Sequence, residues 1–346
     1  MNSASSDAPA PAPAPASFTP PADFSGVIHV VRNGEVLLSQ AHGFADIANE
    51  RPNRLDTRFA TASAGKALVA VGVLSLIAAG RVSLDTRVGD VLSAEVLGVI
   101  NPDVTVRHLL THTSGIGDYF DESVMDDYEE LWADFPNYRV RTGTDLLPRF
   151  NTLPATSAPG TTFAYNNAGY VLLGLVVEKT VGTPLDEFLA QAVLAPAGMT
   201  ASGWFELDRL PGNCANAYIF CDDAWRTNIY SVPAKGIGDG GAFLTAEDVV
   251  RFWTALVAGD IIPAAWVDQA FSVQATGTDE DGDEEHYGFG FWLAGDDAQM
   301  PCFMGEDPGV TFMTSRDPDG LIIVAASNTG DDVWDIHSEL HDIYTA

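Results

Sequence analysis

The sequence predicts an α+β fold in which one antiparallel sheet is built from both ends of the ordered chain. Helices flank this sheet, and a helical insertion fills the middle of the chain. The prediction rests on β-rich runs that lie near the start and again in the last third, with helical patterns between them. Alternating strand–helix units, which would indicate a doubly wound parallel sheet, are missing. The length of 346 residues, with 46% hydrophobic residues, suits one large or two closely joined domains.

The first predicted elements are two strands and a long helix. Residues 1–23 are rich in alanine and proline, and we expect them to form a disordered tail. Two β-rich runs, 27–31 and 35–40, flank Asn33-Gly34, which is a strong hairpin signal. An apolar helix is expected to follow Ser63 and to end at Gly80, a residue type typical of helix C-termini.

The rest of the chain divides into a helical middle and a mixed last third. Helices are predicted at 104–111, 121–133, 142–150, 167–180 and 184–195. Thr245 is the expected N-cap of a helix that runs to Ala258. Strands are predicted at 287–293, 299–303, 310–315 and 321–327, before a last helix over 331–344. The expected domains are therefore a discontinuous α/β unit (24–85 plus 230–346) and a mainly helical unit (86–229), with the functional site between them.

The charge balance excludes two classes of partner. The chain has 48 acidic against 17 basic residues, a formal net charge of −31. Such a field repels nucleic acids and anionic membranes. Adaptation to high salt and ordinary acidity are both open explanations. No apolar run of membrane-spanning length and no signal-peptide pattern occurs, so we expect a cytoplasmic protein, with a removed leader as the alternative.

Cysteine and histidine positions do not predict a metal site. Cys214, Cys221 and Cys302 fit no zinc spacing, so we expect reduced thiols, with a Cys214–Cys221 bridge as the alternative. His108 and His112 lie four residues apart, but no third ligand stands out. We expect these histidines to support the loop from Ser114 to Tyr119, and we expect neither a metal nor another cofactor.

The first chemical motif is Ser63-Ala64-Gly65-Lys66 at the start of the apolar helix. Residues three apart share one helix face, so the hydroxyl and the amine point into the same space. A lysine against an apolar helix is costly unless it is paired or neutral, and a neutral amine can activate a serine nucleophile. Taken alone, the Ser-x-x-Lys pattern fits a surface serine and a snorkelling lysine somewhat better than it fits an activated nucleophile.

Two later segments supply the other groups that a serine hydrolase needs. Tyr165 can act as a base if nearby cations lower its pKa, and the Asn167 amide can hold the lysine or a substrate carbonyl. The backbone after Gly305 can complete an oxyanion hole through the N–H of Glu306. Taken singly, Tyr165 would be a core tyrosine and Asn167 a helix N-cap.

Together these motifs resemble the serine β-lactamase-like hydrolases, which include class C β-lactamases, D-alanyl-D-alanine carboxypeptidases, D-aminopeptidases and family VIII esterases. Ser-x-x-Lys and Tyr-x-Asn are the first two motifs of that superfamily. Further similar stretches, 56–59, 106–116, 240–248 and 287–292, follow in the expected order between Phe24 and Tyr344.

The resemblance implies a β-lactamase-like fold and a role for each motif residue. Ser63 is the implied nucleophile, and Lys66 and Tyr165 relay its proton. Asn167 is implied to contact the substrate or Lys66. The N–H groups of Ser63 and Glu306, the latter placed by Gly305, are the implied oxyanion hole.

One position departs from the family pattern. The third motif of β-lactamases is Lys-Thr-Gly, and in related peptidases it is often His-x-Gly, whereas this chain has Phe303-Met304-Gly305. Loss of the cation argues against substrates that carry a carboxylate. We therefore expect an acyl-enzyme hydrolase for a small neutral or cationic ester or amide. A D-amino-acid peptidase or carboxypeptidase acting on a short peptide is the alternative, followed by a weak β-lactamase or an inactive ligand-binding relative.

Overall fold

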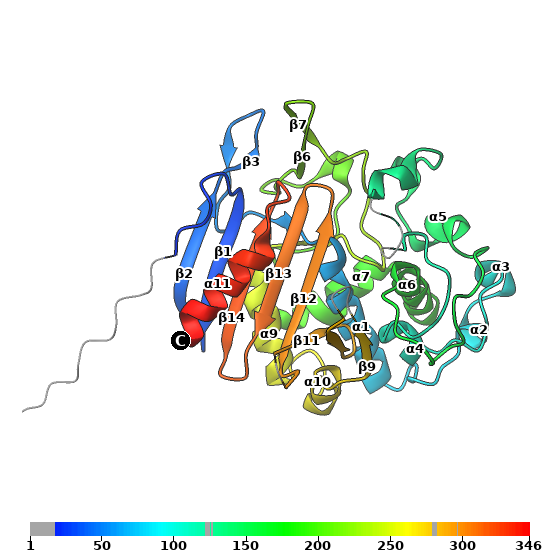
Figure 1. Ribbon diagram of the computed structural model, residues 1–346. Coiled ribbons are helices and arrows are strands. Elements are labelled where there is room, and N and C mark those ends of the chain that lie inside the picture. Colours follow the sequence, from blue (N-terminus) through cyan, green and yellow to red (C-terminus); the bar gives the residue numbers. More distant parts are fainter. Residues whose placement is uncertain (1–17, 122–124, 126, 279–281, 296) are drawn as a thin grey trace, which may run out of the picture.

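The computed structural model describes residues 18–121, 125, 127–278, 282–295 and 297–346 (Figure 1). Its centre is an eight-stranded antiparallel sheet in the order β2-β1-β14-β13-β12-β11-β10-β9. These strands are β1 (Gly26–Arg32), β2 (Glu35–His42), β9 (Ala275–Thr278), β10 (Glu284–Tyr287), β11 (Trp292–Ala294), β12 (Met300–Asp307), β13 (Val310–Arg316) and β14 (Leu321–Ser327).

Strands from the two ends of the chain pair with each other in this sheet. β1 pairs with β14 along its whole length, with Val30 opposite Ile323. Asn33 and Gly34 make the turn between β1 and β2, both with positive φ, as an Asn-Gly hairpin requires. The prediction of an antiparallel sheet assembled from both chain ends is confirmed.

Alternating side chains of β14 bury both faces of the sheet. Leu321, Ile323 and Ala325 pack against α11 (Val333–Thr345), whereas Ile322 and Val324 belong to the main core on the other face. α9 (Ala246–Ala258) and α1 (Gly65–Ala78) lie on that second face (Figure 1). A strand buried on both faces reads as a continuous apolar run, which explains why this one was recognisable in the sequence.

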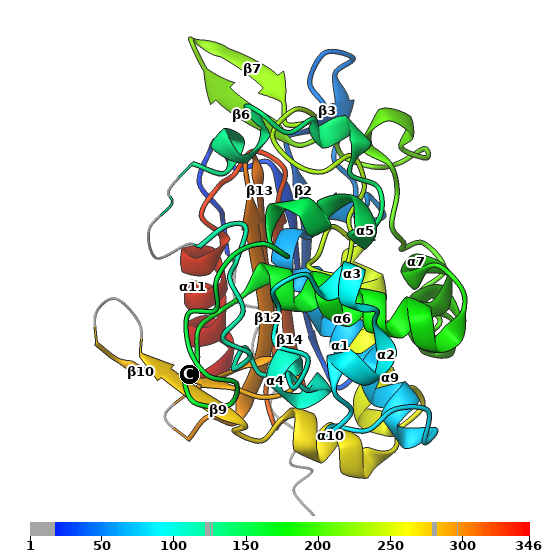
Figure 2. The ribbon, with the colours of Figure 1, turned by 90° about the vertical axis from the view of Figure 1, so that its right-hand side faces the viewer.

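The predicted helical middle is present, but several of its helices are shorter than expected (Figure 2). α6 (Asn167–Val181) matches its predicted length closely, and α4 (Val106–Leu110) lies within its predicted range. The helix predicted at 184–195 is also present, as an unbroken helical run over 185–197 that contains one π-helical stretch. The remaining helices are α2 (Val88–Val91), α3 (Ala94–Leu97), α5 (Gly143–Leu146), α7 (Leu185–Leu189), α8 (Ala195–Ala197) and α10 (Ala264–Ala270). Tighter 3₁₀ turns are η1 (Ala62–Ala64), η2 (Tyr128–Trp132), η3 (Asn137–Arg139), η4 (Leu147–Arg149) and η6 (Leu207–Arg209), and η5 (Ala190–Leu194) is a π-turn.

Several boundaries differ from the prediction. The packed chain begins before residue 24, because Phe18 is buried against the β1/β14/α11 cluster. Residues 1–17 and part of the helix predicted at 121–133 lie outside the described residues. The strand predicted at 287–293 is two strands, β10 and β11, because residues 288–291 turn with Gly290 at φ 87°. The division into two domains stays a prediction.

Short strands that the sequence did not predict form three small pairs. They are β3 (Phe44–Asp46) with β4 (Arg51–Pro52), β5 (Phe59–Ala60) with β8 (Phe243–Leu244), and β6 (Tyr218–Cys221) with β7 (Ala224–Thr227). The β6–β7 hairpin lies within the region predicted to be mainly helical. Asp222 and Asp223 make its turn, both with positive φ, a conformation that aspartate tolerates.

Two further expectations concern cysteines and membranes. All three cysteines are free, so Cys214 and Cys221 are not bridged. Within the described part of the chain, no helix is both long and apolar enough to cross a bilayer.

Candidate active site

Ser63 lies on a tight turn that leads directly into the buried helix α1. The turn is η1, and Ala62 just before Ser63 adopts φ 45°, a left-handed conformation that is uncommon outside glycine. The Ala62 carbonyl accepts a hydrogen bond from the Gly241 N–H at 3.0 Å, and the Thr61 hydroxyl donates to the Ala242 carbonyl at 2.9 Å. The turn is therefore held by Gly241, the last residue of the glycine-rich segment 236–241, and by Ala242, which follows it.

Lys66 is buried beside Ser63 and contacts three oxygens. Its Nζ lies 2.8 Å from Ser63 Oγ, 2.7 Å from Asn167 Oδ1 and 2.7 Å from the carbonyl oxygen of Asp239. The side chain is 2% exposed. Burying a lysine is costly unless its hydrogen bonds are satisfied, and here three partners from three separate segments supply them.

Asn166 and Asn167 divide two tasks at the start of α6. Asn166 is the N-cap, because its Oδ1 accepts the Gly169 N–H at 2.6 Å. Asn167 is therefore free of the capping role considered from the sequence, and its Oδ1 binds Lys66 instead. Helix α6 thus carries the amide of Asn167 to the amine of α1.

Tyr165 lies just before α6, packed between two other rings. Its ring lies 4.5 Å from that of His112 and 6.0 Å from that of Trp292, with the Tyr165 and Trp292 planes inclined by 16°. Lys66 Nζ lies 4.9 Å from the centre of the Tyr165 ring. The structure therefore brings together the serine, lysine, tyrosine and asparagine that the sequence singled out.

His112 supports this tyrosine segment, and Asn166, which it holds, donates its side-chain amide to the Ile116 carbonyl of the loop 114–119. Its Nδ1 accepts the Asn166 N–H at 3.0 Å, so the ring proton is on Nε2, 3.2 Å from the Tyr287 hydroxyl. Burial, with the nearby Lys66 charge, lowers the pKa of His112 well below its usual value. A neutral, fixed ring therefore lies against Tyr165. The sequence showed His112 but not this role, because the contact spans 54 residues.

Gly305 brings strand β12 directly against the Ser63 turn. A Cβ at this position would lie 2.5 Å from the backbone nitrogens of Ser63 and Ala64 and 2.5 Å from the Thr61 carbonyl oxygen. Only glycine fits this approach. β11 pairs with Met300–Cys302, and the following part of β12 extends past it to η1. Glu306, the next residue, lines the two cavities that meet at Ser63.

Phe303, where the sequence motifs predict the loss of the family's cation, does not face the site. It is 2% exposed and belongs to a cluster of aromatic rings, with Trp253 at 5.1 Å, Phe252 at 5.6 Å and Phe291 at 6.1 Å between ring centroids. Phe303 is therefore part of the aromatic core, and β12 packs with an aromatic ring at this position.

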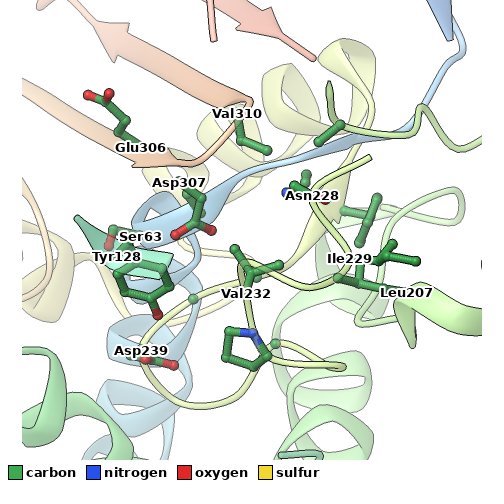
Figure 3. Close-up of a pocket in the computed structure, with 18 of the residues that line it drawn as sticks. Ser63, Tyr128, Leu207, Asn228, Ile229, Val232, Asp239, Glu306, Asp307 and Val310 are labelled. Carbon is green, nitrogen blue, oxygen red and sulfur yellow. The ribbon is translucent and has the colours of Figure 1, made fainter. Parts of the chain in front are cut away.

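Two cavities meet at Ser63. An open cleft of about 960 Å³ also contacts Tyr165, Trp292 and Gly305. A smaller chamber of about 90 Å³ also contacts Asn167 and Asp239 (Figure 3). In Figure 3 the carboxylates of Asp239 and Asp307 lie on the Ser63 side of this chamber, and apolar side chains such as Ile229 and Leu207 lie farther from it.

All charged side chains that line the open cleft are acidic in the part of the chain that the structure describes: Asp127, Glu129, Glu285, Glu306 and Asp307. The same description finds no cluster of three or more His, Cys, Asp or Glu residues able to hold a metal ion. The arrangement can therefore offer a nucleophile, an amine and acidic surroundings to a substrate.

Comparison with known proteins identifies the family. The family model described as Beta-lactamase matches residues 18–340. The chain belongs to this family of hydrolases. The fold prediction is confirmed by the same match.

The relatives carry different activities in their names. The chain is 27% identical to penicillin-binding protein 4* of Bacillus subtilis over 310 residues, which cover 85% of this chain and 65% of that protein. It is 38% identical to esterase EstB of Burkholderia gladioli over 179 residues, which cover 51% of this chain and 45% of that protein. The matched part of this chain thus covers less than two thirds of the length of each of these two relatives. The crystal structure of a penicillin-binding protein from Bacillus halodurans is 37% identical, with a TM-score of 0.87 over 92% of this chain and 97% of that one.

Proposed function

We propose that this protein is a serine hydrolase that acts through an acyl-enzyme on Ser63, with a small neutral or cationic ester or amide as substrate. The observation that carries the proposal is the buried amine of Lys66, 2.8 Å from Ser63 Oγ. An amine that close to a hydroxyl can accept its proton as the oxygen attacks a carbonyl carbon.

The surroundings of Lys66 suit both of its protonation states. As an ammonium group it donates three hydrogen bonds, to Ser63, Asn167 and Asp239. As a neutral amine it donates two, to Asn167 and Asp239, and accepts the Ser63 hydroxyl proton on its lone pair. The same three contacts therefore accommodate the amine before and after proton transfer, without movement of the segments that hold it.

Tyr165 is the second proton carrier in this proposal. It lines the open cleft together with Ser63, and its ring lies against Lys66. Attack by Ser63 forms a bond to the carbonyl carbon, and the leaving alcohol or amine takes a proton as its bond to that carbon breaks. Tyr165 and Lys66 share this proton as one coupled unit, so the pair rather than either residue serves as general acid and base. The backbone N–H groups of Ser63 and Glu306 are the proposed oxyanion donors.

The acidic lining sets the expected substrate charge. Glu306 and Asp307 line the same cleft as Ser63, and the position of the family cation is the buried Phe303. A substrate carboxylate would be repelled there, whereas an uncharged or ammonium-bearing substrate would not. This favours esters and amides over β-lactams.

Covalent labelling tests the proposal. A fluorophosphonate probe should modify the wild type on Ser63, identified by peptide mass spectrometry, and should leave Ser63→Ala unmodified. Hydrolysis of p-nitrophenyl acetate should be lost in the same variant. A wild type that is folded, by circular dichroism, yet takes no label at Ser63 would overturn the enzyme proposal.

A D-amino-acid amidase or peptidase is the second candidate, because acidic side chains near Ser63 would attract a free substrate amine. Comparing D-alanine p-nitroanilide with its N-acetyl derivative separates the two candidates. A preference for the free amine that weakens with added salt supports the peptidase. Faster turnover of nitrocefin than of either short ester or amide contradicts the proposed substrate charge.

A further inference from the structure

Two adjacent residues outside the motifs, Asp118 and Tyr119, hold the segments that contact Lys66. Asp118 Oδ2 accepts the N–H of Asn167 at 2.6 Å, and its Oδ1 accepts the N–H of Ala168 at 3.0 Å. Both carboxylate oxygens are therefore bonded to the first two residues of α6. Asn166 already caps this helix through Gly169, so Asp118 adds a second anchor next to Asn167.

Tyr119 anchors the opposite side of the lysine. Its hydroxyl donates to the Asp239 carboxylate, and its side chain is 5% exposed. Asp239 lies in the segment 236–241, in which the other residues are four glycines and Ile237. Such a glycine-rich segment loses much conformational entropy when it is held in one conformation. A side-chain hydrogen bond that holds it is therefore needed more here than in an ordinary loop.

These two anchors converge on one atom. Asn167 Oδ1 and the Asp239 carbonyl are two of the three oxygens bonded to Lys66 Nζ, and the third is Ser63 Oγ. Asp118 fixes the backbone that carries the first, and Tyr119 fixes the residue that carries the second. Because the two anchors are neighbours in one loop, they also fix the distance between α6 and the glycine-rich segment.

We propose that Asp118 and Tyr119 are a pair of positioning residues that set the place of the Lys66 amine relative to Ser63. The proposal rests on the proposed function of Ser63 and Lys66 and extends it to residues that neither motif contains. Asp118 lines neither cavity, so its effect is on the acylation step rather than on substrate binding.

The charges around the pair agree with this role. Asp118 and Asp239 both lie in the field of Lys66, and burial raises the pKa of both carboxyl groups. The pKa of Asp118 rises to about 7 despite backbone N–H donors from Asn167, Ala168 and Phe120. Asp118 is half-buried, and it keeps its place near Lys66 although desolvation disfavours its charged form.

The test compares Asp118→Asn, Tyr119→Phe and the double variant with Asp145→Asn as the matched control. Asp145 also caps a helix, because its Oδ2 accepts the Thr142 N–H at 2.9 Å and the Arg141 N–H at 3.1 Å at the start of α5. It lines neither cavity. Tyr119→Phe removes a single oxygen, so it remains informative if a change at Asp118 impairs folding.

The readouts are kcat and KM for p-nitrophenyl acetate and the rate of fluorophosphonate labelling at Ser63. We expect both test variants to lose about 10- to 100-fold in kcat and in labelling rate, the size expected for a displaced proton carrier. KM should stay nearly unchanged in Asp118→Asn, which is the cleaner test because Tyr119 lines the smaller chamber. The double variant should lose less than the product of the two single losses, because both act through one amine. Asp145→Asn should keep wild-type rates.

The two proposals fail in different ways. A wild type without label at Ser63 overturns the proposed function. A wild type that labels, with Tyr119→Phe and Asp118→Asn labelling as fast as Asp145→Asn, overturns the positioning role alone. Multiplicative losses in the double variant, or a rise in KM without a fall in kcat, also contradict it.

Discussion

Gly305→Ala is the change that most directly tests how β12 and the Ser63 turn are assembled. The added methyl group would lie 2.5 Å from the backbone nitrogens of Ser63 and Ala64 and 2.5 Å from the Thr61 carbonyl. All three atoms belong to the backbone, so no side chain can rotate away. Either β12 or the Ser63 turn must move.

The size of this movement follows from the geometry. Ordinary Cβ contacts lie at 3.4 Å or more, so the two backbones must separate by about 1 Å. A misplacement of about 1 Å at a reacting group can cost on the order of 100-fold in rate. The free energy of unfolding should change less than the rate does, because β12 keeps its pairing with β13 from Cys302 to Asp307. We expect a strong fall in kcat with a modest fall in the free energy of unfolding.

The assay combines fluorophosphonate labelling at Ser63, hydrolysis of p-nitrophenyl acetate and urea unfolding. Gly212→Ala is the matched control, because a Cβ there meets no atom within 4 Å. That control should keep wild-type rates and stability. If Gly305→Ala labels at more than about a third of the wild-type rate, the argued contact between β12 and the Ser63 turn is wrong.

Three further predictions concern stability. Phe303→Lys should lower the free energy of unfolding in urea by at least about 3 kcal/mol, because it replaces a buried ring packed on Trp253. This variant should not hydrolyse nitrocefin faster than the wild type does. A stable variant with faster nitrocefin turnover would refute this prediction. Burial lowers the pKa of His337, which is hydrogen-bonded to Ser315, to about 4. As the pH falls from 6.5 toward 4, this histidine therefore binds a proton in the unfolded chain but not in the folded one. The free energy of unfolding should fall over this range by up to about 3 kcal/mol. His337→Asn should lack this pH dependence, and equal slopes for variant and wild type would contradict the assignment. The net charge of −31 predicts that unfolding becomes harder between low and molar salt, and no gain would exclude high-salt adaptation.

The sequence predicted the sheet well because its strands carry strong local signals. Asn33-Gly34 marks one hairpin, and β14 is a continuous apolar run. The short helices of the middle region have no such signal. α5, for example, is a single turn held by a capping box at Thr142 and by packing against α6, so its length depends on tertiary contacts. The β6–β7 hairpin was missed because its turn uses two aspartates instead of Asn-Gly.

The site was predictable in its residue types but not in its supporting contacts. Ser63 and Lys66 are neighbours on one helix, so their proximity follows from local geometry. Asp239 was not predicted, because its backbone carbonyl rather than its side chain contacts Lys66. A pattern of side chains in the sequence cannot predict a backbone acceptor that lies 173 residues from Lys66 along the chain. The loss of a cation at Phe303 stays a prediction from the motif, and the packing of this residue in the aromatic core could be seen only in the structure.

The burial of Lys66 links stability to the proposed chemistry. Lys66 is one of three lysines in the chain and is the one that is fully buried, which is costly for an amine. Its contacts with Asn167 and Asp239 offset this cost only if α6 and the glycine-rich segment both stay in place. Removing either acceptor leaves the amine short of a partner, so the same contact serves the fold and the proton transfer. Variants at these positions must therefore be compared at equal folded fraction, because a fall in rate alone would not separate the two effects.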